Sequence, residues 1–256
     1  KTMNGRVIVV GLGPGDPTQI TPQVAQAINL ATDVIGYIPY IERIVPKKGV
    51  TLHPSDNRLE IERAEHALTL AQAGRIVLIV SSGDPGVFAM AAALFEALEK
   101  NLPKWQYVDI EILPGITAML AVVALVGAPL GHDFCVINLS DNLKSWSIIE
   151  KRLLGAVEAD FAMALYNPRS KSRPEGFEKT LKLLQSQCEP DRPVIFARAV
   201  TTKEETVQIV PICKANAEMA DMRTLVIVGS SQTRIVKQNK REWIYTPRSY
   251  PDTVIQ

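Results

Sequence analysis

The sequence predicts an α/β fold in which mainly parallel or mixed sheets are flanked by helices. Short apolar segments typical of buried strands alternate with longer segments whose apolar residues recur at helical spacing. Three of the strand-like segments run directly into turns rich in glycine and proline, as at the carboxyl ends of strands in open α/β sheets. The 256 residues are enough for two such domains.

The first half of the chain alternates strands and helices from its beginning. Thr21 is suited to cap a helix that has Pro22 as its first residue. Gly74 is suited to end a charged helix expected over residues 57–73. Strands are expected at residues 6–10, 33–37, 75–80 and 108–113, and helices from 21 or 22 onward, over 57–73, over 87–100 and after 118.

The same pattern restarts after Gly131. Strands are expected at residues 134–138, 160–165, 194–200, 206–210 and 225–229, and helices over 145–155 and 175–187. We therefore expect an amino-terminal domain over residues 4–132 and a carboxyl-terminal domain over 133–238. The polar tail, 239–256, is expected to be peripheral.

Composition narrows the classes of partner. Hydrophobic residues make up 46% of the chain, charged residues 21%, and the formal net charge is +1. Such a chain lacks the basic field of a nucleic-acid-binding protein, and its 6% of aromatic residues offers few base-stacking platforms. Glycine and proline interrupt the most apolar segment, 112–130, so neither a membrane span nor a signal peptide is expected, and the chain is expected to be cytoplasmic. It opens with Lys1-Thr2-Met3, as a piece of a longer polypeptide could.

The three cysteines predict no metal centre. Cys135, Cys188 and Cys213 are widely separated, and no CxxC spacing occurs. We expect buried, reduced thiols.

The first glycine-rich loop, 11–17, resembles a dinucleotide-binding fingerprint but differs from it in two ways. Asp16 stands where that motif needs its last glycine, and the following helix begins several residues too late to face a pyrophosphate. A nicotinamide- or flavin-dependent oxidoreductase is therefore a disfavoured alternative. The loops at 83–86 and 114–118 also follow buried strands, so three loops are expected to gather at one sheet edge. There, glycines would let the backbone approach a small, flat ligand.

Four stretches, taken in order, resemble the tetrapyrrole methylase family: GLGPGDPTQIT, SSGDPGVF, PGITAMLAVVALVGAPLGHDF and LYNPRS. The resemblance covers about residues 6 to 236. HPSDN, GDPGVFAMAAALFEALE and YNPRSKSRP are most similar to members that methylate C17 of precorrin-3B with contraction of the macrocycle, on the route to cobalamin. Members that act on cobalt-containing factor III come next, and the family also includes methylases of uroporphyrinogen III, of a diphthamide precursor and of ribosomal RNA.

The resemblance implies two α/β domains with S-adenosylmethionine bound between them, and a homodimer. It also implies a set of cofactor-binding residues in this sequence: Pro14, Gly83, Asp84, Pro85, Val87, Phe88, Thr117, Ala118, Tyr166, Asn167, Arg198, Ala199 and Thr224. The family often has a hydrophobic residue at the position of Asn167 and a glycine at that of Ala199. Contact through the backbone is therefore an open alternative at these two positions.

Methyl transfer from a sulfonium mainly requires alignment of the reacting atoms, and no nucleophile is predicted. Ring contraction would also require a base that removes a proton from a substrate hydroxyl. His53, His132, Asp16 and Asp84 are the candidates by loop position, with Asp16 and His132 ranked first, whereas His66 is expected to be a surface residue.

A tetrapyrrole carries acetate and propionate groups, which arginine binds well in bidentate geometry. Arg43, Arg58 and Arg169 are the predicted substrate-binding residues. Other basic residues in the same loops are Lys47, Lys48, Lys171 and Arg173. The small-molecule substrate is the expected partner, with no nucleic acid and no membrane. Alternatives are an RNA or protein substrate, or a tetrapyrrole-binding protein without catalytic activity.

Overall fold

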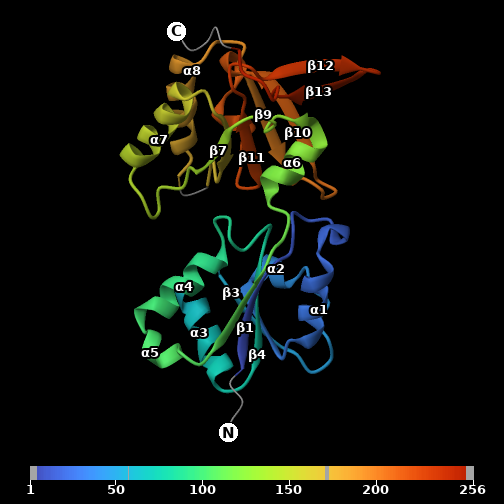
Figure 1. Cartoon of the computed structure of the whole chain (residues 1–256), viewed down its shortest axis with the longest axis vertical. Helices are drawn as coiled ribbons and strands as arrows, with labels where there is room; N and C mark the ends of the chain where they lie inside the picture. Colours follow the sequence, from blue (N-terminus) through green and yellow to red (C-terminus); the bar gives the residue numbers. More distant parts are fainter. Residues whose placement is uncertain (1–4, 57, 171–172, 252–256) are drawn as a thin grey trace. The chain divides into compact units, whose positions relative to one another are not determined.

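The structure is a computed structural model that describes residues 5–56, 58–170 and 173–251. It consists of two compact units, residues 1–117 and 118–256 (Figure 1). The division falls earlier than the boundary expected at 132/133. The reason is that α6 (Ala118–Val126) packs on β11 (Thr224–Val228), and β6 (Gly127–Ala128) pairs with β13 (Arg241–Tyr245), so both elements belong to the second unit.

The first unit is built on a five-stranded parallel sheet with the strand order β3-β2-β4-β1-β5. Its strands are β1 (Arg6–Gly11), β2 (Asp33–Tyr37), β3 (Thr51–Ser55), β4 (Ile76–Ser81) and β5 (Asp109–Leu113). Its helices are α1 (Pro22–Leu30), α2 (Ile38–Ile41), α3 (Glu60–Gln72), α4 (Met90–Lys100) and α5 (Leu102–Trp105), with a 3₁₀ turn η1 (Pro17–Gln19).

Helices cover both faces of this sheet, as the sequence predicts. Alternate residues of each strand point to opposite faces. Val7 and Val9 of β1 pack with α3 and α4, whereas Ile8 and Val10 pack with Val24 of α1. In Figure 1, α3 and α4 accordingly lie on one side of the strands and α1 on the other.

The second unit holds a five-stranded mixed sheet with the order β10-β9-β11-β8-β7, in which only β7 and β8 are parallel. Helices α7 and α8 cover one face, where Ile149, Leu153 and Phe177 are fully buried. The remaining elements are β7 (Phe134–Asn138), α7 (Trp146–Glu158), β8 (Ala162–Tyr166), α8 (Gly176–Gln187), β9 (Pro193–Arg198), β10 (Thr206–Pro211), β12 (Arg234–Gln238), and the 3₁₀ turns η2 (Ile212–Lys214) and η3 (Ala217–Met219).

The sequence analysis missed four strands, β3, β6, β12 and β13, and for β3 and β13 the reason is identifiable. β3 contains Pro54, which removes a backbone donor, and the structure places this strand at the sheet edge, where that loss is tolerated. β13 lies in the expected tail, where Ile244 and Thr246 are buried. The described part of the tail therefore packs against the second unit at Ile244 and Thr246, whereas its other residues are exposed or half-buried.

Cysteine burial differs from the expectation at two positions. The three cysteines are free thiols, but only Cys188 is buried, while Cys135 is partly buried and Cys213 is exposed. Within the described residues, no group of histidine, cysteine and carboxylate side chains is arranged to hold a metal ion. Among the described residues, no helix is both long and apolar enough to cross a membrane.

Candidate cofactor and substrate site

Three loops of the first unit meet at the carboxyl edge of its sheet. They follow β4, β1 and β5, which are neighbours in the sheet, so the loops lie side by side as the sequence predicts. Gly13 and Gly83 exchange backbone hydrogen bonds of 3.1 and 2.9 Å, which fasten the first loop to the second. Both glycines have positive φ, +73° and +60°, which few other residues adopt.

The second and third loops are joined by Asp84. Its carboxylate accepts a hydrogen bond of 2.7 Å from the Gly86 amide in its own loop and one of 3.0 Å from the Gly115 amide in the third loop. A Cβ atom on Gly115 would collide with the Gly83 carbonyl and with the backbone of Gly11. The predicted residue Asp84 therefore organises the loops, and only glycine fits beneath them.

The other predicted residues of this unit belong to the same loops. Pro14 lies between Gly13 and Gly15 in the first loop, and Pro85, Val87 and Phe88 lie in the second. Phe88 has a φ of +51°, a conformation that bulky residues rarely adopt and that a constrained loop must impose. Thr117 ends the third loop.

Asp16 and Arg43 have structural roles at this edge. The Asp16 carboxylate accepts hydrogen bonds of 2.8 Å from the amide and the hydroxyl of Thr18, which caps η1 and lowers the pKa of Asp16. Arg43 donates hydrogen bonds to the Leu12 carbonyl at 2.7 Å and to the Gly13 carbonyl at 3.2 Å, so its guanidinium stabilises the backbone of the first loop. A lowered pKa makes Asp16 a weaker base.

The second unit gathers its predicted residues at one edge of its own sheet. Tyr166 ends β8, Arg198 ends β9, and Thr224 begins the antiparallel β11 opposite Arg198. The Met119 amide donates a 3.1 Å hydrogen bond to the Tyr166 hydroxyl, which brings the start of α6, and thus Ala118, to the same edge.

The two positions where this sequence departs from the family both have a left-handed backbone conformation. Asn167 and Ala199 have φ values of +53° and +48°. Asparagine tolerates this left-handed region, and glycine prefers it. The glycine that the family often has at position 199 suits the backbone found there, so the chain path at this position is compatible with either residue.

Asp221, which the sequence analysis did not single out, holds this edge together. Its carboxylate accepts hydrogen bonds from Arg198 Nε at 2.5 Å, from the Arg223 amide at 2.8 Å and from the Thr224 hydroxyl at 2.9 Å. Burial alone would raise the pKa of Asp221, but these hydrogen bonds outweigh that effect and lower it. The hydrogen bond to Asp221 raises the pKa of Arg198, and the negative charge of Asp221 adds a smaller contribution in the same direction.

His132 lies at the opposite edge of this sheet. It precedes β7, whose Phe134 pairs with Ala162 at the amino end of β8. Its Nδ1 is 2.9 Å from the Arg248 carbonyl, and its ring stacks on Tyr250 with the centroids 5.8 Å apart. The structure thus separates His132 from Tyr166 and the other predicted residues of this unit, which argues against the base role predicted for it.

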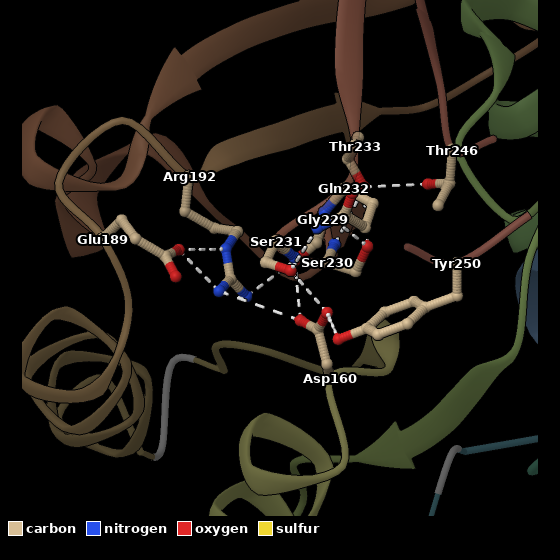
Figure 2. A network of polar contacts seen from close by, with 10 residues as sticks. All are labelled: Asp160, Glu189, Arg192, Gly229, Ser230, Ser231, Gln232, Thr233, Thr246 and Tyr250. Atoms are coloured by element: carbon tan, nitrogen blue, oxygen red, sulfur yellow. Dashed lines mark hydrogen bonds and ion pairs between the residues drawn. The ribbon is translucent and has the colours of Figure 1, made fainter. Parts of the chain in front are cut away.

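A polar network holds the tail at that far edge (Figure 2). Asp160 accepts hydrogen bonds from the Ser231 amide at 2.8 Å and from the Tyr250 hydroxyl at 2.9 Å. The buried Arg192 lies between Glu189, at 2.6 Å, and Asp160, at 4.0 Å. His132 and this network therefore serve the packing of the tail.

The remaining candidates are distributed over both units. His53 Nε2 lies 2.8 Å from the buried Asp33 and its ring packs on the exposed His66. Arg58 is exposed in the turn before α3, and Arg169 contacts the Ala217 carbonyl and Glu218. Lys47 and Lys48 are exposed, Arg173 pairs with Asp141, and Lys171 lies outside the described residues.

Two further polar residues, one in each unit, lie at these sheet edges, and the sequence analysis did not predict them. Asn138 ends β7 and accepts a 3.0 Å hydrogen bond from the Asn167 side chain. Arg63 is buried at the start of α3. Asn138 could have been found from its place as the polar last residue of an apolar strand. Arg63 carried no such signal, because its spacing is that of an ordinary helix face.

A profile of the family described as Tetrapyrrole (Corrin/Porphyrin) Methylases matches residues 6–215. The chain belongs to the tetrapyrrole methylase family. A relative from Sinorhizobium sp., named precorrin-3B C(17)-methyltransferase, is 50% identical over 97% of this chain and 98% of its own length. A probable cobalt-factor III C(17)-methyltransferase of Salmonella typhimurium is 37% identical over 94% of this chain and 98% of its own length. The cobalamin biosynthesis protein CobIJ of Mycobacterium tuberculosis (strain ATCC 25618 / H37Rv) is 45% identical over 98% of this chain, which spans only about half (49%) of that protein.

Solved structures agree with the family assignment. The crystal structure of the methyltransferase CobJ matches with a TM-score of 0.91 and 58% identity, covering 95% of this chain and all of that one. A uroporphyrin-III C-methyltransferase from Thermus thermophilus, complexed with S-adenosylhomocysteine, matches with a TM-score of 0.65 and 22% identity, covering 88% of this chain and 97% of that one. At that identity the likeness concerns the fold alone. The predicted family and the predicted α/β fold are thus confirmed.

Proposed function

We propose that this tetrapyrrole methylase transfers a methyl group from S-adenosylmethionine to C17 of precorrin-3B, with contraction of the macrocycle to precorrin-4, in cobalamin biosynthesis. The observation that carries the proposal is the 50% identity over nearly the whole of both chains to a protein named for the C17 reaction. The 58% identity to the methyltransferase CobJ supports it.

A cobalt-containing substrate is the second candidate. A relative named for cobalt-factor III has the same near-complete coverage but is only 37% identical. The difference in identity favours the metal-free substrate, and both substrates belong in the test.

The donor set of the three loops fits S-adenosylmethionine. Its adenine and ribose carry no charge, so they suit backbone amides and carbonyls. A Cβ atom on Gly11 or Gly115 would collide with the backbone of the neighbouring loops, so glycine lets the three loops pack closely there. We infer that Gly83, Pro85, Val87, Phe88 and Thr117 hold the cofactor together with Pro14 and Asp84. Ala118, Tyr166, Asn167, Arg198, Ala199 and Thr224 complete the proposed set.

The bound cofactor supplies an activated methyl group on a sulfonium. The chain's own contribution is alignment, which can be worth several kcal/mol when the reacting atoms are held in line. The Asp84 bridge and the Gly13–Gly83 pair keep the loops in register for this task. Arg198 is already paired with Asp221, so its proposed contact is through the backbone.

The base that removes the substrate hydroxyl proton remains a proposal among Asp16, His53 and Asp84. Each has a hydrogen-bonding partner within the fold: Thr18 for Asp16, Asp33 for His53, and two backbone amides for Asp84. Of these, His53 lies within β3 beside Asp33, which begins β2, whereas Asp16 and Asp84 lie in the loops at the carboxyl edge of the sheet. Of the predicted substrate-binding residues Arg43, Arg58 and Arg169, we propose Arg58 as the leading one, because its side chain is exposed whereas the other two contact atoms of the fold.

Calorimetric titration with S-adenosylhomocysteine, with NAD as the control ligand, tests the cofactor. We expect binding of S-adenosylhomocysteine alone; binding of NAD alone would mean that the loops serve an oxidoreductase. Incubation with labelled S-adenosylmethionine and either precorrin-3B or cobalt-factor III then tests the reaction. Retention of the coloured substrate without methyl transfer would identify a tetrapyrrole-binding protein instead. Sedimentation would test the proposed homodimer, and cell fractionation the proposed cytoplasmic location.

A further inference from the structure

Arg63, in the first turn of α3, is a buried charge that the proposed mechanism does not use. Only 5% of the residue is exposed. Arginine is rarely buried unless its donors are occupied, because removing the guanidinium from water is costly. The contacts of this side chain therefore indicate what its burial achieves.

The guanidinium of Arg63 joins three segments. Nε donates to the Ser55 hydroxyl at 2.7 Å, at the end of β3, and Nη2 donates to the Asp56 carbonyl in the loop that follows. Nη1 lies 3.6 Å from Met90 Sδ, in the first residue of α4. All three acceptors are uncharged. Burial lowers the pKa of Arg63, and the charge of Glu60 opposes that effect.

These three segments meet at the functional edge of the first sheet. Ser55 ends β3, so the loop after it emerges at the same carboxyl edge as the three glycine-rich loops. Met90 directly follows the second of those loops. Two strand spacings, about 10 Å, separate β3 from β4, which is on the scale of a macrocycle that extends its carboxylate groups outward from the cofactor loops.

The loop after β3 leads directly into α3. No side chain caps α3 at Leu59, the residue that precedes the helix. The Asp56 carbonyl is instead fixed by Arg63 from within the helix. Arg58, the exposed residue proposed to bind a substrate carboxylate, stands two positions beyond that carbonyl.

We propose that Arg63 is a positioning residue for tetrapyrrole recognition: it fixes the loop after β3 against the start of α4, so that Arg58 is held in place for a carboxylate of the macrocycle. This inference rests on the proposed function and extends it to a residue that contacts the loop rather than the substrate.

Lysine in place of Arg63 keeps the charge but cannot make the forked contact to Ser55 and Asp56. For Arg63→Lys we expect the KM for the tetrapyrrole to rise about tenfold, with kcat within about twofold of wild type and the Kd for S-adenosylhomocysteine unchanged. Arg58→Ala should show the same split. Since both changes act through one loop, the double variant Arg58→Ala/Arg63→Lys should be no worse than Arg58→Ala alone.

Arg75→Lys is the matched control. Arg75 is also a bonded arginine of the first unit, but it pairs at 2.7 Å with Asp33, at the amino end of β2. We expect this variant to keep the wild-type KM. If Arg63→Lys fails to fold, Arg63→Gln takes its place in the same cycle, because its amide nitrogen can stand where Arg63 Nε does but cannot also reach the Asp56 carbonyl.

Three results would overturn the inference. An unchanged KM in Arg63→Lys would remove the link to the substrate. Equal loss of tetrapyrrole and S-adenosylhomocysteine affinity would indicate a general structural role. Multiplied effects in the double variant would show that Arg63 acts independently of Arg58. Failure of the wild-type protein to methylate either tetrapyrrole would instead refute the proposed function, and it is recognised separately because it needs no variant.

Discussion

The Asp84 carboxylate accepts a hydrogen bond from the Gly115 amide at 3.0 Å and so ties the loop after β4 to the loop after β5. The hydrogen-bonded pair Gly13 and Gly83 ties the loop after β1 to the loop after β4. These hydrogen-bonded cross-links join the three loops into one rim at the carboxyl edge of the sheet. Affinity for a ligand at this rim should depend on the cross-links as well as on the residues that contact the ligand.

Asp84→Asn tests the cross-link. An amide has only one acceptor oxygen, so one of the two backbone amides would face an NH₂ group and lose its partner. We expect the Kd for S-adenosylhomocysteine to rise about tenfold, the equivalent of about 1.4 kcal/mol, by calorimetry. Asp109→Asn, at the exposed amino end of β5, is the matched control and should bind as wild type does. Wild-type affinity in Asp84→Asn would show that the rim tolerates loss of the bridge.

Gly115→Ala tests the packing beneath the rim. The new methyl group would collide with the Gly83 carbonyl and the Gly11 backbone, which cannot rotate away as a side chain would. Overpacking of this kind costs about 1–3 kcal/mol, so the first unit should unfold at lower temperature in a calorimetric scan. Gly155→Ala, in α7 with open space around it, should instead stabilise the second unit by about 0.5–1 kcal/mol. Equal shifts in the two variants would contradict this reading of the rim.

Elements with a strong local pattern could be predicted from sequence to within a few residues. Thr21 and Pro22 begin α1 as predicted, and the strand expected at 134–138 is β7 without change. β3 was missed because its proline has a low strand propensity, which its edge position in the sheet overrides. β13 was missed because its burial depends on pairing with β6, far away in sequence.

Some residues of the candidate site could likewise be predicted from the sequence, and others could not. Loop residues such as Gly83 and Asp84 could be located because a strand that ends in a glycine-proline turn indicates a sheet edge. The roles of side chains could not be predicted, because they depend on partners distant in the chain. His132 is bound to the carbonyl of Arg248, and Arg43 to carbonyls of the first loop.

Asp33→Asn should destabilise the first unit in a pH-dependent way. Burial would raise the pKa of Asp33, but hydrogen bonds from His53, Thr32 and Arg75 outweigh it and lower the pKa below the reference value of 3.8. A lowered native pKa contributes stability that is present above pH 3.8 and is lost as the pH falls below it. We expect urea unfolding near neutral pH to show a loss of about 2–3 kcal/mol, since the bonds involve charged groups. The difference from wild type should shrink below pH 3.8; a difference independent of pH would exclude the carboxylate as its source.

His132→Ala separates a base from a structural contact. If His132 were the general base, its loss would lower kcat by about 10²–10⁴ and remove a pKa from the pH–rate profile. We expect instead that kcat and the profile remain near wild type, because His132 lies at the edge of the second sheet opposite Tyr166. The change should appear in hydrogen exchange, with faster deuterium uptake over residues 246–250, where the ring holds the Arg248 carbonyl and stacks on Tyr250. Tyr250→Phe, which keeps the stacked ring but loses the hydrogen bond to Asp160, should loosen the same segment without any effect on catalysis. A large loss of kcat in His132→Ala with no change in exchange would restore the base assignment and require the tail contacts to be reinterpreted.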